Sequence, residues 1–290
     1  MRRILPIISI LIILSLACST LTPTQEAAPT RTSAVDAPTA QPAFTATPVE
    51  ALPTTQALLM VFDAETGRAE AVMDGEVLTA VRTGAASGVA TDALARPEAA
   101  VAAVIGAGVQ GHRQLEAVCC VRPVREALVY DENQEAALRF AAELAEALGF
   151  PVRVLHKVSA IREADVVCTA TSSSRPVFAD ADLASGTHIN AIGAFRPDAR
   201  EIPGATVARA RIVVDSRSAC LAEAGDLILA IEEGRLPAGF RPDELGELVI
   251  GAAPGRTDAT EITLFKSVGN AVQDLAVAGL VLSEAARLGL

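Results

Sequence analysis

The chain has 290 residues, a formal net charge of −11 and a hydrophobic content of 51%, so it can bury the core of one or two domains. Aromatic residues make up only 3% and tryptophan is absent, which leaves a core of Ala, Val, Leu and Ile, the usual composition of parallel α/β folds. The acidic balance, without a basic tract after residue 3, argues against nucleic acid as a partner. The five cysteines lack CxxC spacing and the three histidines are scattered, so we expect no metal site.

The first 56 residues have the composition of a leader and a linker. In residues 1–18 a basic pair precedes an apolar run that ends at Ala17, and Cys18 follows, an arrangement typical of a secretory signal. The Ala17-Cys18 pair also resembles a bacterial lipoprotein cleavage site, at which Cys18 would be lipidated and would tether the protein to a membrane. Residues 19–56 contain ten Thr and six Pro, which predicts an extended, disordered linker. We therefore expect an exported, membrane-anchored protein if the leader is used and a cytoplasmic protein if it is not.

The rest of the chain begins with a hairpin and a helix and continues as alternating strands and helices. The apolar pattern and turn residues of 58–72 predict the hairpin, and 76–95 has helical spacing. From residue 99 onward apolar strands alternate with helical segments, which predicts an α/β fold with a Rossmann-type doubly wound parallel sheet. The periodicity from Glu261 to Leu290 is again helical. The expected strands of the sheet are 100–108, 126–131, 152–156, 166–172, 187–195 and 210–216.

The stretch GAGVQG predicts a dinucleotide site. It gives Gly106, Gly108 and Gly111 the full GxGxxG spacing, follows a buried strand and opens a helix. The first glycine permits a tight turn, the second lets the backbone approach a pyrophosphate, and the third lets helix and strand pack closely, with the helix N-terminus facing the phosphates. Asp131 ends the next strand, where it would accept hydrogen bonds from the adenosine ribose and repel a 2′-phosphate. This favours NAD over NADP; the alternative is a glycine-rich turn without a ligand.

Three further residues could serve a ligand or have a structural role. Arg82 lies among small residues and could bind a carboxylate or a cofactor phosphate, or it could be a surface arginine. Lys266 would begin a helix that faces a cleft, or be a surface lysine. His188, in GTHINAIGAF, would lie with Asn190 at the strand end where ligands bind, as an acid or base or as a hydrogen-bonded structural histidine. No Ser/His/Asp or Cys/His arrangement can be assembled from the sequence.

Several segments together resemble one family, the ornithine cyclodeaminase and mu-crystallin group. They run in order from about Leu52 to the C-terminus, about four fifths of the chain, and are LPTTQALLMVFDAETG, LTAVRTGAAS, VIGAGVQG, DVVCTATSSSRPVF, GTHINAIGAFRPDAREI, VVDS followed by AEAGDL, and PGRTDATEITLFKSVGNAVQDLAVA.

The resemblance implies a Rossmann domain with a smaller domain that binds substrate and forms a homodimer. It also implies hydride exchange with NAD at the α-carbon of a small amino or imino acid, with Arg82 on the substrate carboxylate and Lys266 beside the nicotinamide. The implied cofactor-binding residues are Gly106, Gly108, Val109, Gln110, Gly111, Asp131, Thr169, Thr171, Ser172, Ser267, Val268 and Gly269. The implied division is a leader (1–18), a linker (19–56), an incomplete substrate and dimerisation domain (57–97 plus 262–290) and an NAD-binding domain (98–261).

Two departures from the family pattern bear on the activity. Ornithine cyclodeaminases carry an acidic residue at the position of Phe195, so a reductase or dehydrogenase acting on an amino or imino acid is favoured over an ammonia lyase. The family's first third supplies an arginine and a lysine that act on the substrate, but Arg31 is the only basic residue between Arg3 and Arg68. The alternative hypothesis is therefore an exported, catalytically impaired protein that binds a nucleotide or metabolite.

Overall fold

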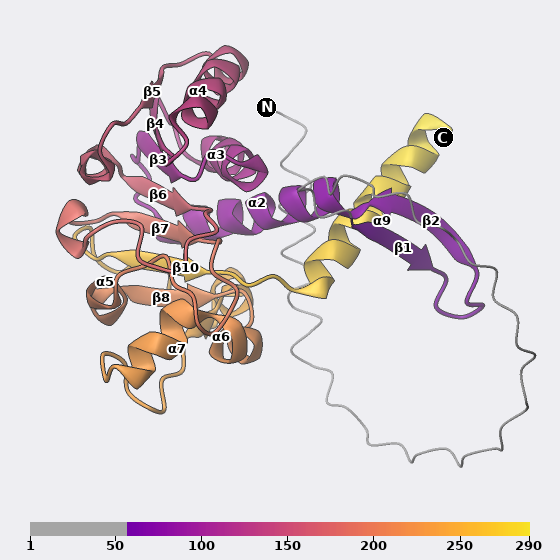
Figure 1. Ribbon diagram of the computed structural model, residues 1–290. Helices are drawn as coiled ribbons and strands as arrows, with labels where there is room; N and C mark the ends of the chain where they lie inside the picture. The colour runs from indigo at the N-terminus through magenta and orange to yellow at the C-terminus, as the bar shows by residue number, and fades with distance from the viewer. Residues whose placement is uncertain (1–56) are drawn as a thin grey trace, which may run out of the picture.

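Eight parallel strands form the main sheet of residues 57–290, the part of the chain that the computed structural model describes (Figure 1). The central strands are buried on both faces, which confirms the predicted doubly wound sheet. Their order is β5-β4-β3-β6-β7-β10-β8-β9, so the order reverses between β3 and β6. The bounds are β3 Val101–Ile105, β4 Glu126–Tyr130, β5 Val152–Val154, β6 Val166–Thr169, β7 His188–Ala191, β8 Arg211–Val214, β9 Asp243–Glu244 and β10 Thr263–Lys266.

Helices cover both faces of this sheet (Figure 1). They are α3 Val109–Val121, α4 Gln134–Leu148, α5 Gly204–Arg209, α6 Arg217–Glu223, α7 Gly225–Glu232 and α8 Leu245–Val249, with 3₁₀ turns at Val158–Glu163 and Asp180–Asp182. Ala102 and Val104 of β3 belong to the core under α3 and α4. Their neighbours Ala103 and Ile105 belong to the core under α5 and α7. This alternation follows from the two-residue period of a strand.

A second part of the molecule, which we call the arm, projects from the sheet (Figure 1). It consists of the antiparallel strands β1 (Leu58–Phe62) and β2 (Ala69–Asp74), the first turns of α2 (Gly75–Leu94), and the helix α9 (Ala271–Leu288). The hairpin and the helix α2 confirm the sequence prediction. The buried side chains of the arm's small core are Leu78, Val277 and Ala278, packed with Leu59, Val61, Met73 and Val81.

Helix α2 joins the arm to the sheet. It begins where the Asp74 carboxylate accepts hydrogen bonds from Glu76 N and Val77 N. Farther along, α2 lies against α3, and a Cβ at Gly84 would come within 2.7 Å of the Arg113 carbonyl oxygen. Because small residues permit this close approach, α2 reaches the edge of the sheet at which the glycine-rich loop lies.

One predicted element has the wrong type. The sequence predicted helix from Glu261 onward, but Thr263–Lys266 is the strand β10, which lies between β7 and β8. The predicted domain boundary at 262 placed residues 263–266 in the smaller domain with 57–97, but these residues belong to the large sheet. A short apolar run does not distinguish a buried strand from a buried helix turn by periodicity.

The predicted leader (1–18), with Cys18, and the predicted linker (19–56) lie outside the described residues. Among the helices of residues 57–290, none combines the length and apolar character that crossing a membrane requires.

Candidate cofactor and substrate site

A cavity of about 460 Å³ lies at the carboxyl edge of the sheet, where α2 and α3 meet the loops that follow β6, β7 and β10. Ligands bind at this edge in open α/β sheets. Among the described residues that line it, Arg82 alone is charged, and no carboxylate, histidine or lysine is present. The lining residues are Thr79, Arg82, Thr83, Gln110, Ala170, Thr171, Ser172, Ile192, Gly193, Phe195, Ser267, Val268 and Gly269.

The glycine-rich loop between β3 and α3 has the geometry that its spacing predicts. Gly106 has φ +105°, and a Cβ there would lie 2.4 Å from the Ala170 carbonyl oxygen. A Cβ at Gly111 would lie 2.1 Å from the Gly106 carbonyl oxygen, so close packing of helix on strand requires a glycine. Gly108 is exposed with open space around it, and as the N-cap of α3 it offers no side chain to the helix amides. These features fit a bound pyrophosphate.

Asp131 connects the end of β4 to the glycine-rich loop. One carboxylate oxygen accepts a hydrogen bond from Ala107 N at 2.8 Å, and the other accepts one from Asn133 N at 2.8 Å. The carboxylate is only partly buried, so it retains acceptor capacity for a ribose hydroxyl. Binding of NAD by Asp131, Val109 and the glycines stays a prediction.

Arg82 is held in place by the first turn of α9. Its Nη1 donates to Gln273 Oε1 at 2.9 Å, and its Nε lies 3.1 Å from Asp274 Oδ1. The guanidinium lies against Gly269, where a Cβ would come within 2.8 Å of Nη1 and 2.9 Å of Nη2. Gln273 accepts a hydrogen bond from Nη1 and Asp274 forms an ion pair beside Nε, so Nη2 is left as the donor for a carboxylate in the cavity.

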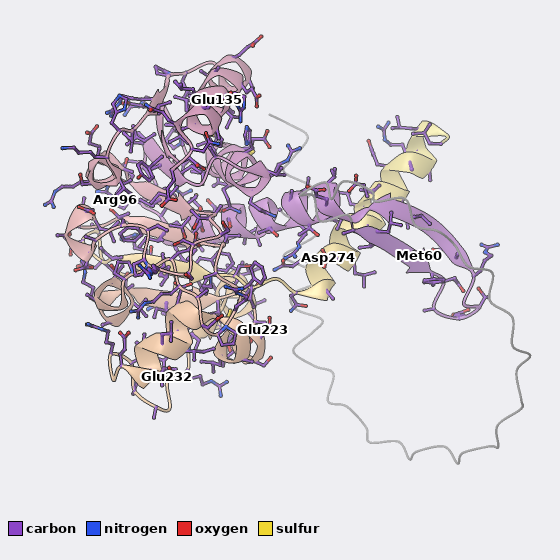
Figure 2. All side chains as sticks on the ribbon, viewed as in Figure 1. Met60, Arg96, Glu135, Glu223, Glu232 and Asp274 are labelled. Atoms are coloured by element: carbon purple, nitrogen blue, oxygen red, sulfur yellow. The ribbon has the colours of Figure 1, made fainter. Side chains whose placement is uncertain are left out.

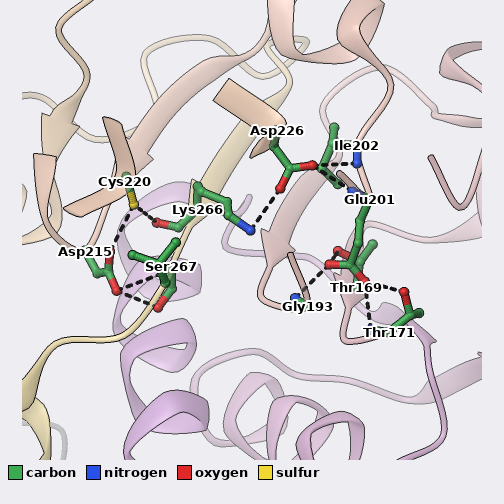
Figure 3. Close-up of polar contacts among 11 residues, drawn as sticks. Thr169, Thr171, Gly193, Glu201, Ile202, Asp215, Cys220, Asp226, Lys266 and Ser267 are labelled. Carbon is green, nitrogen blue, oxygen red and sulfur yellow. Dashed lines mark hydrogen bonds and ion pairs between the residues drawn. The ribbon is translucent and has the colours of Figure 1, made fainter. Parts of the chain in front are cut away.

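A buried glutamate joins the loops after β6 and β7 (Figure 3). Glu201 Oε1 accepts hydrogen bonds from Thr171 N at 2.7 Å and Thr171 Oγ1 at 2.8 Å. Its Oε2 accepts from Gly193 N at 2.7 Å and Thr169 Oγ1 at 2.8 Å. Burial raises the pKa of Glu201, while the nearby Lys266 charge opposes that rise. Thr169 is thus fully buried and its hydroxyl is directed at Glu201, whereas Thr171 lines the cavity.

A second carboxylate holds the loop that follows β10. Asp215 Oδ2 accepts hydrogen bonds from Ser267 Oγ at 2.7 Å, Val268 N at 3.2 Å and Gly269 N at 2.8 Å. Since Gly269 in turn contacts Arg82, Asp215 sets one wall of the cavity.

Lys266 does not lie in the cavity, contrary to its predicted place beside the nicotinamide. It ends β10 instead of beginning a helix, and its side chain is fully buried. Lys266 Nζ lies 2.9 Å from Asp226 Oδ2, and Asp226 is also fully buried (Figure 3). The lysine therefore neutralises a buried carboxylate, because an unpaired charge at either position would be costly.

His188 lies at the opposite edge of the sheet, contrary to its predicted place at the ligand-binding end. It is the first residue of β7, and that strand reaches the cavity only after Ala191. Its Nδ1 lies 2.9 Å from Thr263 Oγ1 and its Nε2 lies 3.1 Å from Asn190 Oδ1. Burial lowers the pKa of His188 to about 3, so it is the neutral, structural histidine of the alternative interpretation.

The structure brings most of the predicted site residues together at one edge. Arg82, Gln110, Thr171 and Ser172 line the cavity with the segment 267–269. The sequence interpretation missed Glu201, Asp226 and Asp215, all of which act on backbone amides. Glu201 and Asp215 lie in loops and Asp226 lies in the first turn of α7. An acidic residue at such a position carries no signal of its own, because a solvated carboxylate and a buried one have the same sequence pattern.

Comparison with known proteins identifies relatives. A Delta(1)-pyrroline-2-carboxylate reductase of Bacillus cereus is 41% identical over 239 residues, 82% of this chain and 73% of that protein. The ketimine reductase mu-crystallin of Mus musculus is 38% identical over 232 residues, 80% of this chain and 70% of that protein.

The chain is also similar to solved structures. The Thermococcus litoralis Delta(1)-pyrroline-2-carboxylate reductase in complex with NADH and L-proline has a TM-score of 0.80 and 42% identity, over 82% of this chain and 74% of that one. An archaeal alanine dehydrogenase dimer with bound NAD has a TM-score of 0.78 and 36% identity, over 83% and 74%. The model of the ornithine cyclodeaminase/mu-crystallin family matches residues 26–287. The chain therefore belongs to the ornithine cyclodeaminase/mu-crystallin family.

Proposed function

We propose that the protein is an NAD-dependent oxidoreductase that reduces the C=N bond of a small α-imino acid to the α-amino acid. One observation carries the proposal: a single cavity combines the edge of a dinucleotide-binding sheet with one cation, Arg82, and no other charged group among the described lining residues. NADH, when bound, supplies the hydride. The relatives named above, which include reductases of cyclic imino acids, support this reading.

The chain's own residues would bind and orient the two reactants. The exposed Gly108 and the amides that follow it suit the pyrophosphate, and Asp131 suits the ribose of NAD better than the 2′-phosphate of NADP. Arg82 would bind the substrate carboxylate through Nη2, in an orientation held by Gln273 and Asp274.

The lining of the cavity favours reduction of an imine over the other reactions of the family. A protonated cyclic imine accepts a hydride at carbon and needs no further proton at nitrogen. Ammonia loss with ring closure, or amination of a keto acid, requires a group that moves protons. Phe195 lines the cavity at the position where ornithine cyclodeaminases carry an acid, and its ring is exposed.

Titration with NADH followed by turnover tests the proposal. We expect saturable NADH binding, tighter than NADPH binding, and oxidation of NADH with cyclic α-imino acids, but slower oxidation with keto acids plus ammonia. Arg82→Lys should raise KM for the imino acid by about tenfold or more, because the lysine lacks the planar donors. Arg139→Lys, an exposed arginine paired with Glu135 on α4, is the matched control and should leave KM unchanged.

The same experiment separates the second hypothesis, a binding protein without turnover. NADH binding with no oxidation of any imino or keto acid would support a catalytically impaired domain. Arg31 is the only basic residue between Arg3 and Arg68, so the arginine and the lysine that the resemblance implies have no candidates there, and this favours that alternative. Absence of NADH binding would contradict both hypotheses.

We further propose that the arm forms a homodimer. Its hairpin exposes an apolar face with Met60 53% exposed and Val72, its cross-strand partner, 61% exposed. Figure 2 places Met60 on the arm, away from the sheet. Met60→Glu should convert a dimer to a monomer in sedimentation analysis, while Leu138→Glu, an equally exposed position on α4, should not. A monomeric wild type would contradict this proposal.

We also propose export with a membrane tether through Cys18, on the composition of residues 1–18. Mass spectrometry of the mature N-terminus tests this: a lipidated Cys18 supports it, and an intact Met1 on a cytoplasmic protein contradicts it.

A further inference from the structure

Three loops at the carboxyl edge of the sheet lie in close contact with one another. A Cβ at Gly106, in the glycine-rich loop, would lie 2.4 Å from the Ala170 carbonyl oxygen after β6. A Cβ at Gly193, after β7, would lie 2.3 Å from the Thr171 carbonyl oxygen and 2.5 Å from Glu201 Oε1. The loop after β6 is therefore in close contact with the glycine-rich loop on one side and with the loop after β7 on the other.

The Glu201 carboxylate joins two of these loops, those after β6 and β7, by hydrogen bonds. It is fully buried and does not line the cavity. Each of its oxygens accepts one backbone amide and one hydroxyl: Oε1 from Thr171 N and Oγ1, and Oε2 from Gly193 N and Thr169 Oγ1. Four donors around one carboxylate form a directed, charge-assisted set of hydrogen bonds.

The backbone of Glu201 is itself held by a buried ion pair (Figure 3). Asp226 Oδ1 accepts hydrogen bonds from Glu201 N at 2.8 Å and Ile202 N at 2.9 Å. Its other oxygen lies 2.9 Å from Lys266 Nζ, at the end of β10. Through Asp226, the central strand β10 thus determines where the Glu201 carboxylate lies.

We propose that Glu201 is a positioning residue for the cofactor: its carboxylate sets the separation between the loops after β6 and β7, and so the shape of the cavity that receives NADH. Asp226 and Lys266 act through Glu201 and not on the reactants. The inference rests on the proposed function as far as NADH is concerned.

Glu201→Gln is the test, because glutamine keeps the shape but has one acceptor oxygen in place of two. Its amide NH₂ must face either Thr171 N or Gly193 N, so one backbone hydrogen bond is replaced by two opposed donors. We expect the Kd for NADH to rise at least about tenfold, which is about 1.4 kcal/mol, and kcat to fall. Deuterium exchange should become faster in peptides covering 169–172 and 191–193.

Asp165→Asn is the matched control. Asp165 also accepts two backbone amides, Ala100 N at 2.8 Å and Val101 N at 3.0 Å, and also binds Arg96, but at the opposite edge of the sheet. It should lower Tm while leaving the Kd for NADH and the exchange of the two cavity loops unchanged. A purely structural role for Glu201 predicts that both variants lower Tm and neither alters the Kd.

A Glu201→Gln protein that is folded and has the wild-type Kd and kcat overturns the inference. If the wild type itself does not bind NADH, the proposed function fails, and exchange of the two loops then decides the inference by itself. Faster exchange in Glu201→Gln than in Asp165→Asn supports it, and equal exchange overturns it.

Discussion

The two edges of the large sheet contain the same kinds of polar contact, but these contacts have different roles. At the amino edge, Asp165 accepts two consecutive amides, that of the residue before β3 and that of its first residue, and His188 lies between Thr263 and Asn190. At the carboxyl edge, Asp226 also accepts two consecutive amides, Glu201 N and Ile202 N. The contacts at the amino edge hold packed segments together, whereas those at the carboxyl edge hold loops around a cavity.

The difference between the edges lies in whether the polar groups that lack a partner border the cavity. At the amino edge the His188 ring has a partner on both nitrogens and is fully buried. The Nε atoms of Arg96 and Arg211 lack a partner there, but neither residue lines the cavity. At the carboxyl edge, Gln110 Oε1 has no partner although it is buried, and α3 has no side-chain cap. An unsatisfied polar group that borders a cavity indicates a ligand. A titratable side chain is thus informative about function only when its partners are known.

Among the variants at the carboxyl edge, Gly106→Ala has the largest expected effect. The new methyl group would lie 2.4 Å from the Ala170 carbonyl oxygen, at φ +105°, so we expect the free energy of unfolding to fall by about 2–5 kcal/mol and NADH binding to be lost. Chemical denaturation and NADH titration measure the two effects.

Gly149→Ala provides the control, because Gly149 also has a positive φ, +75°, but nothing lies within 4 Å of its Cβ position. It should cost about 1–2 kcal/mol and leave NADH binding intact. If the two variants lost equal amounts of unfolding free energy, the positive φ, and not the contact with the loop after β6, would account for the cost of Gly106→Ala.

The amino edge predicts a smaller, pH-dependent effect. The pKa of His188 is lowered from 6.5 to about 3 by burial, so the unfolded chain takes up a proton that the folded chain does not as the pH falls below 6.5. Stability is therefore fully present above pH 6.5 and is lost progressively toward pH 3, by about 2 kcal/mol at pH 5.

His188→Gln should remove this slope between pH 6.5 and pH 5, because glutamine can hydrogen-bond Thr263 and Asn190 without titrating. Urea denaturation at several pH values measures it. A wild type and a variant with the same slope in that interval would contradict a buried neutral histidine, while the Kd for NADH should be the same in both.

Much of the fold follows from local patterns. The alternation of apolar strands and helices predicted the parallel sheet, and the spacing of Gly106, Gly108 and Gly111 predicted a tight turn and close packing, because these demands act within a few residues. The strand β10 was missed because its four residues, TLFK, are too few to show a distinctive period. The site was predicted in part: Arg82 and residues 267–269 line the cavity, but Lys266 does not.

By itself the sequence determined the period of each element, the turn at the glycine-rich loop and the family to which the chain belongs. The tertiary structure decided which charges meet. Lys266 and Asp226 are 40 positions apart, and only the insertion of β10 beside β7 and β8 brings them to 2.9 Å. Strand order, and with it the partner of each buried charge, depends on contacts between distant segments, and no local spacing encodes such contacts.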